Sequence, residues 1–190
     1  MAVAHLAAAG EPYSDMHPDA DRVAALCGRA TRTSSAGRLF DAVAAIAGVS
    51  MSSAFEGQAA MLLEALARGV EPEPAYPFEL AGEDIVVAPM IRAIARDARN
   101  HVAPARIARR FHTTLVELIG HACAQLAHGE GLRDVVLSGG VFQNAILASE
   151  VPARLRSLGL IPHVHRRMPP NDGGLAFGQL AVAAAREGIA

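Results

Sequence analysis

Apolar residues recur at helical spacing through the first two thirds of the chain. The spacing predicts helices within residues 20–49 and over residues 55–68, and two more that open at Pro89 and Pro104 and run to about Arg99 and His128. Ser34 or Ser35 would cap the second helix of the first stretch. The side chains expected to be buried are Val23, Leu26, Cys27, Leu39, Phe40, Val43, Ala44, Ile46, Ala47, Met61, Leu62, Ala65, Leu66, Ile107, Phe111, Leu115, Leu118, Ile119, Ala122 and Leu126.

Strand signals appear in two places. After a proline-rich irregular stretch, residues 76–80 and 85–88 predict a hairpin that turns at Gly82, Glu83 and Asp84. In the last third, residues 134–137 predict a buried strand, 144–158 a helix, 160–165 a second strand and 175–186 a final helix. This β-α-β-α order indicates an α/β sheet with crossover helices.

Composition and charge narrow the class of protein. Of the 190 residues 52% are hydrophobic and 19% charged, which excludes wholesale disorder. The net charge of −2 argues against a nucleic-acid protein that works by bulk charge. No stretch is long and apolar enough for a signal peptide or a membrane span. We expect a flexible segment over residues 1–19 and one lobe of a domain over residues 20–190.

Cysteine and lysine usage exclude several kinds of chemistry. Cys27 and Cys123 form no CxxC pair, so a zinc ribbon is excluded, and reduced thiols in a cytoplasmic protein are expected. All 17 basic residues are arginine, which excludes Schiff-base chemistry and a P-loop lysine. The eight histidines show no metal-binding spacing and are interpreted as surface or packed residues.

The sharpest local motif is LSGGVFQNA, in which a strand delivers Ser138, Gly139 and Gly140 onto the start of a helix near Asn144. Glycines permit a close backbone approach, and a helix N-terminus attracts anions. The motif is therefore typical of a phosphate site. A glycine-rich connection without a ligand remains the alternative.

Three carboxylates are candidates beside this turn. Asp172 follows the second strand, so it would lie at the same sheet edge as Ser138, where a divalent metal could bind. Capping the following helix is the alternative role for Asp172. Asp41 and Glu56 could accept hydrogen bonds from ribose hydroxyls, or could be ordinary acids at helix starts.

Five ordered segments together resemble a known family. They are TSSAGRLFDAVAAIAGV, AFEGQAAMLLEALA, ARRFHTT, LSGGVFQNAIL and HRRMPPNDGGLAFGQ, and they look like the C-terminal, Kae-like portion of the HypF carbamoyltransferases over residues 20–185. The resemblance implies part of an actin/Hsp70-like (ASKHA, ribonuclease H-like) nucleotide-binding domain. It also implies that carbamoyl phosphate and ATP yield a carbamoyl-adenylate, whose carbamoyl group passes to the C-terminal cysteine of HypE during [NiFe]-hydrogenase maturation.

The resemblance assigns roles to matching residues of this chain. It places Gly37, Arg38 and Asp41 beside the adenosine, with Asp41 on the ribose, and Glu56 at the same pocket. It places Ser138, Gly139, Gly140 and Asn144 at the phosphates, and makes Asp172 a metal ligand. The cofactors implied are ATP with Mg²⁺, and iron or zinc through Asp172 only if a missing lobe is supplied.

This chain also departs from the family pattern. The histidine pair that supplies the other metal ligands belongs to a preceding lobe, Phe55 replaces a tyrosine, and Leu62 stands where a glutamate is expected. We therefore expect a fragment, a split-gene product or a remnant that does not turn over alone and needs the missing N-terminal HypF domains or a companion chain. The alternatives are another O- or N-carbamoyltransferase, for antibiotic tailoring or tRNA threonylcarbamoyladenosine, and a non-catalytic module that completes a partner chain.

Overall fold

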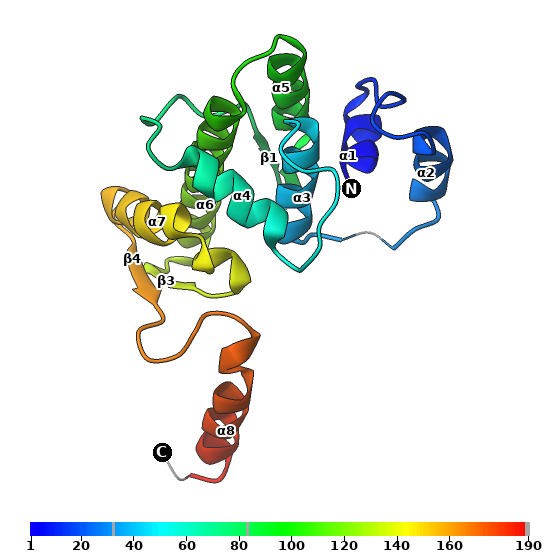
Figure 1. Ribbon diagram of the computed structural model, residues 1–190. Coiled ribbons are helices and arrows are strands. Elements are labelled where there is room, and N and C mark those ends of the chain that lie inside the picture. The colour runs from blue at the N-terminus through cyan, green and yellow to red at the C-terminus, as the bar shows by residue number, and fades with distance from the viewer. Residues whose placement is uncertain (32, 83, 189–190) are drawn as a thin grey trace. The chain divides into compact units, whose positions relative to one another are not determined.

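The computed structural model describes residues 1–31, 33–82 and 84–188 (Figure 1). The chain divides into two compact units, Met1–Ile119 and Gly120–Ala190, called here the N-terminal and C-terminal units. The structure is mixed α/β and rich in helices, as expected. Among the described residues, no helix is both long and apolar enough to cross a membrane.

The N-terminal unit is built mainly from helices around one aromatic core. Its elements are α1 (Ala2–Ala9), α2 (Ala20–Cys27), α3 (Ala36–Ile46), α4 (Gln58–Ala67), β1 (Glu79–Ala81), β2 (Asp84–Val86), α5 (Ala88–Arg99) and the first part of α6 (Pro104–Glu130). Phe40 of α3 meets Phe111 of α6 edge to face, with ring centroids 4.9 Å apart. Both rings are fully buried, which makes them the centre of this core.

The first residues differ from the expected flexible segment. Ala2–Ala9 form α1, which buries Val3 and Leu6 and packs against α3 and α5. Four buried apolar side chains stabilise this short helix through tertiary contacts, which the sequence of the segment does not display.

Two helices do not bury the residues expected of them. On α4 the buried stripe is Ala59, Leu63 and Ala67, while Met61, Leu62, Ala65 and Leu66 are exposed. On α2, Val23 and Leu26 are exposed as well. Both faces of α4 carry apolar residues at helical spacing, so the pattern alone could not select the buried one. The cap prediction is confirmed, because Ser35 Oγ accepts a hydrogen bond from the Arg38 amide.

The hairpin forms, but it is shorter than expected. Strands β1 and β2 are antiparallel, with Leu80 opposite Ile85. Glu83 of the expected turn lies outside the described residues. Tyr76 belongs to the preceding loop and not to a strand.

A polar network ties that loop to α5 and α6. The buried Tyr76 hydroxyl donates to Asp97 Oδ2 at 2.9 Å, and Arg110 Nη1 donates to the same oxygen at 2.6 Å. The Arg110 guanidinium also lies over the Tyr76 ring, 4.0 Å from its centroid. Burial and the neighbouring Asp97 carboxyl together raise the pKa of Tyr76, so this tyrosine stays protonated as a hydrogen-bond donor.

The C-terminal unit confirms the expected β-α-β-α order. It contains β3 (Asp134–Leu137), a short 3₁₀ turn η1 (Gly140–Gln143), α7 (Ala145–Ser157), β4 (Ile161–Val164), a second 3₁₀ turn η2 (Asp172–Gly174) and α8 (Leu175–Arg186). Strands β3 and β4 are parallel, with Val136 opposite His163, and α7 is the crossover between them.

Burial in this unit is lower than expected. Val136 of the strand expected to be buried is 73% exposed, and the α6 residue Leu126 is exposed too. Helix α8 buries none of its residues, although Leu175, Phe177, Leu180 and Val182 lie on it. The strand prediction was wrong about burial because the described residues of this unit form a sheet of two strands, and parallel strands need covering layers on both faces to be buried.

Candidate functional site

The turn after β3 has the geometry that its glycines predict. Gly139 adopts φ 102° and ψ 157°, a backbone conformation that residues other than glycine rarely adopt. Gly140 then begins η1, and a Cβ at Gly140 would meet nothing nearer than the Asn171 Cβ, 3.9 Å away. Gly140 is exposed, so this backbone can be approached closely by a ligand.

Asn144 anchors the start of α7. Its Oδ1 accepts hydrogen bonds from the amides of Ile146 and Leu147, each at 3.1 Å, and the residue is buried. Two of the N–H donors in the first turn of α7 are thus already satisfied, so fewer of them are left for the anion that the helix N-terminus was expected to attract. An anion at this turn would therefore meet the backbone nearer to Gly140.

The loop carrying Asp172 is tightly built. Asn171, not Asp172, caps η2, since Asn171 Oδ1 accepts from the Gly173 amide at 3.1 Å. A Cβ at Gly174 would lie 2.7 Å from the Pro169 carbonyl oxygen, so only glycine fits there. The exposed Asp172 carboxylate makes no hydrogen bond or ion pair within the described part of the chain, which excludes the capping role considered for it.

Two hydrogen bonds join this loop, and the residue that follows β4, to the turn at Ser138–Gly140. The Gly139 amide donates to the Pro170 carbonyl at 2.7 Å, and His165 Nε2 lies 2.9 Å from Ser138 Oγ. Ser138, Gly139, Gly140, Asn144 and Asp172 therefore belong to one local assembly at the carboxyl ends of β3 and β4, as expected.

Sequence reasoning missed the part played by His163 on β4 and by His165 directly after it. Beside the His165 contact with Ser138, His163 Nε2 lies 2.6 Å from Asp134 Oδ1. The two histidines alternate along a strand and so share a face, which was the available signal. The partners could not be inferred from the sequence because Asp134 lies on β3 and Ser138 directly after it, 29 and 27 positions away in the chain.

The remaining candidates lie in the N-terminal unit, at the start of α3 and before α4. Arg38 Nη1 and Asp41 Oδ2 are 3.4 Å apart on one side of α3, next to Gly37. Glu56 is exposed and precedes α4.

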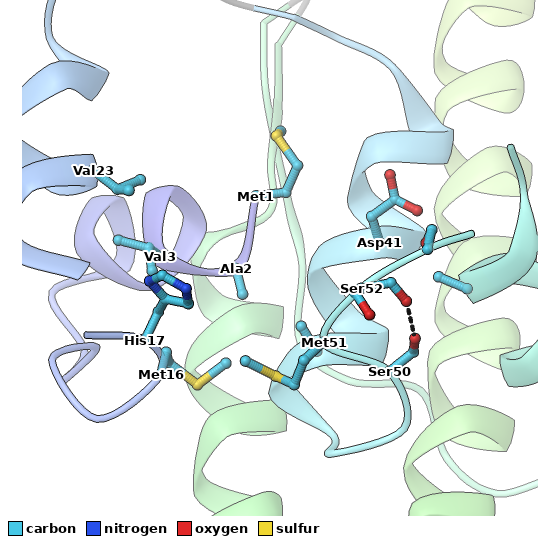
Figure 2. Close-up of a pocket in the computed structure, with 13 residues that line it drawn as sticks. Met1, Ala2, Val3, Met16, His17, Val23, Asp41, Ser50, Met51 and Ser52 are labelled. Carbon is cyan, nitrogen blue, oxygen red and sulfur yellow. Dashed lines mark hydrogen bonds between the residues drawn. The ribbon is translucent and has the colours of Figure 1, made fainter. Parts of the chain in front are cut away.

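Asp41 also lines a cavity of about 370 Å³. In Figure 2, Met16, His17 and Val23 line one side of the cavity, and Asp41, Met51 and Ser52 line the other. Gly37, Arg38 and Glu56 are not among the described residues that line it. Methionine side chains beside one carboxylate and several serines would suit an organic ligand with hydroxyl groups.

The described residues do not by themselves form a metal centre. Within the described ranges, no three side chains of His, Cys, Asp or Glu gather closely enough to hold an ion. Asp172 offers one carboxylate, which leaves most coordination positions to other donors. The arrangement is thus suited to anion binding through the backbone. Asp172 can serve as one ligand of a metal site whose other ligands come from another part of the protein.

Comparison with known proteins agrees with the motifs. Residues 2–179 match the family model "Carbamoyltransferase, Kae1-like Domain, second subdomain". The chain is 39% identical over 157 residues to carbamoyltransferase HypF of Synechocystis and 42% identical over 151 residues to that of Rhizobium leguminosarum, in each case covering 80% of this chain and 20% of the relative.

A solved structure supports the same conclusion. It is described as full-length HypF in the phosphate- and nucleotide-bound form, and it superposes with a TM-score of 0.80 at 35% identity, covering 87% of this chain and 23% of that one. The chain therefore spans about a fifth of the length of the relatives it matches. The chain belongs to the HypF carbamoyltransferase family, and it corresponds to the second subdomain of the Kae1-like domain.

Proposed function

We propose that this chain contributes a phosphate-binding turn and a ribose-contacting carboxylate to the nucleotide site of a HypF-type carbamoyltransferase. The observation that carries the proposal is the β3–Gly139–Gly140–α7 connection, whose exposed backbone is joined by the Gly139–Pro170 hydrogen bond to the loop that bears Asp172. The solved relative described as phosphate- and nucleotide-bound supports the same class of ligand.

In this proposal the backbone near Gly140 holds phosphate oxygens of ATP or of carbamoyl-adenylate, and Asp41 accepts hydrogen bonds from ribose hydroxyls. Gly37, Arg38 and Glu56 lie beside the adenosine. Asn144 acts indirectly, because its side chain holds the first turn of α7 in place beneath the phosphates.

The proposed reaction is transfer of a carbamoyl group to the C-terminal cysteine of a HypE-like protein. The thiolate attacks the carbamoyl carbon and AMP leaves. This chain would contribute by positioning the adenylate and stabilising its negative charge. Mg²⁺ would accompany ATP, and iron or zinc would require further ligands from another lobe, because the described residues supply no set of three ligands.

Exposed apolar surfaces indicate that the site is completed by more protein. Leu180 on α8 is 69% exposed, and Val136 on β3 is 73% exposed. Parallel sheets are normally covered on both faces, and surfaces of this kind mark interfaces. We infer that the rest of a HypF-type protein, in the same polypeptide or in a companion chain, covers them, and that this chain alone does not turn over.

Calorimetric titration with ATP and Mg²⁺ tests the proposal, first on this chain and then after addition of the remaining HypF domains. Gly140→Val and Asp41→Ala should each weaken binding about tenfold or more, whereas the exposed loop acid variant Asp15→Ala should not. Circular dichroism shows whether each variant is folded. Equal affinity in all folded variants, or no binding even with the remaining domains present, would overturn the proposal.

A further inference from the structure

Helix α5 carries three arginines on its exposed side. Arg92, Arg96 and Arg99 are spaced four and three residues apart, which places them along one face of the helix. The other side of α5 buries Ile91 and Ile94 in the core of the N-terminal unit. The three guanidinium groups therefore emerge together from an element that the core holds in place.

These arginines line a cleft of about 360 Å³ that is separate from every residue of the proposed nucleotide site. The other lining residues are Glu11, which follows α1, together with Pro77, Pro89 and Ala93. Helix α1 packs against α5, so both sides of the cleft belong to the same packed unit. The prolines and the small Ala93 give it a rigid, partly apolar wall.

Two of the arginines are held in position by existing contacts. Arg99 Nη2 donates to Glu11 Oε2 at 2.7 Å, and Arg92 Nη1 donates to the Ala9 carbonyl at 3.3 Å. Each contact uses one of the five N–H donors of a guanidinium group. The Arg96 guanidinium makes no hydrogen bond or ion pair with any residue that the structure describes, although the Arg96 backbone carbonyl accepts from the Asn100 amide.

The charge in the cleft is unbalanced. Three guanidinium groups face a single carboxylate, in a chain whose formal net charge is −2. Basic residues in the last turn of a helix are favourable, which accounts for Arg96 and Arg99 as helix residues. That interaction with the helix C-terminus does not account for Arg92, which lies in the middle of α5. Nor does it account for the concave surface that the three arginines share.

We propose that this cleft binds a small molecule that carries phosphate groups. Guanidinium groups match phosphate oxygens with paired N–H donors, and partly ordered arginines lose less entropy on binding. The volume lies at the lower end of the range for small-molecule sites. The proline and alanine side chains supply contacts for the uncharged part of the ligand.

Inorganic pyrophosphate is the probe for this site, titrated at fixed low salt and followed by calorimetry and by NMR signals of the arginine Nε–H groups. Arg96→Gln should weaken pyrophosphate binding about tenfold. Arg156→Gln is the matched control, because Arg156 is also an exposed arginine in the last turn of a helix. It should leave the affinity unchanged.

A second series separates this site from the glycine turn. In the Gly140→Val variant, pyrophosphate should still perturb the α5 arginine signals, whether or not ATP binding survives. Perturbation confined to the Gly139 and Gly140 amides, or equal losses in Arg96→Gln and Arg156→Gln, would overturn the α5 site. Single-stranded RNA that binds more tightly than pyrophosphate and depends on Arg96 would also overturn the small-molecule proposal, in favour of a macromolecular polyanion.

Discussion

The two units of the chain differ in how they satisfy their apolar and polar groups. The N-terminal unit buries Phe40 and Phe111 and closes a polar network around Asp97. The C-terminal unit leaves Phe177 and Leu180 of α8 exposed, and its sheet has two strands. A pair of parallel strands with an uncovered face gains little stability from burial. The C-terminal unit therefore exposes apolar side chains to solvent, whereas the N-terminal unit encloses its own in a core.

That difference concerns what holds each unit in shape. The helical unit contains most of the buried core, whereas the assembly at Ser138, Gly139, Gly140, Asn144 and Asp172 lies in the unit with more open surface. Hydrogen bonds and backbone fit, such as Gly174 against Pro169, hold that assembly in shape. The same substitution should therefore have very different consequences at a buried position of the first unit and at an exposed position of the second.

The largest contrast is expected from the same substitution in each unit. Phe40→Ala should lower the free energy of unfolding by about 4 kcal/mol, because it removes a fully buried ring that contacts Phe111. Phe177→Ala should change it by less than about 0.5 kcal/mol, because the Phe177 side chain is 56% exposed. Urea unfolding measures both, and equal losses would contradict the contrast between the units.

Removing one carboxylate from each unit gives the next largest effect. Asp97→Ala should cost about 3 kcal/mol, since it leaves the Tyr76 hydroxyl and the Arg110 guanidinium without their shared acceptor. Asp134→Ala removes only an exposed contact with His163 and should cost less than about 0.5 kcal/mol. Thermal unfolding by circular dichroism compares the two, with Tyr76→Phe as a milder intermediate. A loss for Asp97→Ala as small as that for Asp134→Ala would show that the network does not stabilise the unit.

The smallest expected effect is a pH dependence in the N-terminal unit. Burial lowers the pKa of His5 on α1, so the unfolded chain binds a proton more readily than the folded one. Stability should be complete above the ordinary histidine pKa and should decline as pH falls through it toward the lower folded value. His5→Gln should remove this part of the profile of unfolding free energy against pH, whereas the exposed His128→Gln should retain it. An unchanged slope in His5→Gln would assign the effect to other groups.

Much of the C-terminal unit could be predicted from local sequence. The glycines of the Ser138–Gly140 turn, the β-branched run before it and the proline–glycine loop before α8 each restrict the backbone locally, so the element order was confirmed. Burial was not predictable in the same way. Leu63 rather than Leu62 is buried on α4, and Val136 is exposed, because burial depends on which distant elements are present to cover a face.

The candidate site, too, was predictable in part from the sequence. The sequence motifs placed Gly139 and Asp172 at one sheet edge, because the carboxyl ends of parallel strands meet there. They could not show that Asn171 caps η2 in place of Asp172, since both side chains can accept the same kind of hydrogen bond.

By itself, the sequence determined the family and the order of helices and strands. It also determined the turn positions where the backbone needs a glycine. Only the tertiary structure decided that α1 belongs to the core, that His165 meets Ser138, and that three arginines of α5 share a cleft with Glu11. Turns and caps depend on interactions among neighbouring residues, which a sequence displays directly. Contacts between distant elements depend on packing, where many apolar patterns are compatible with more than one buried face.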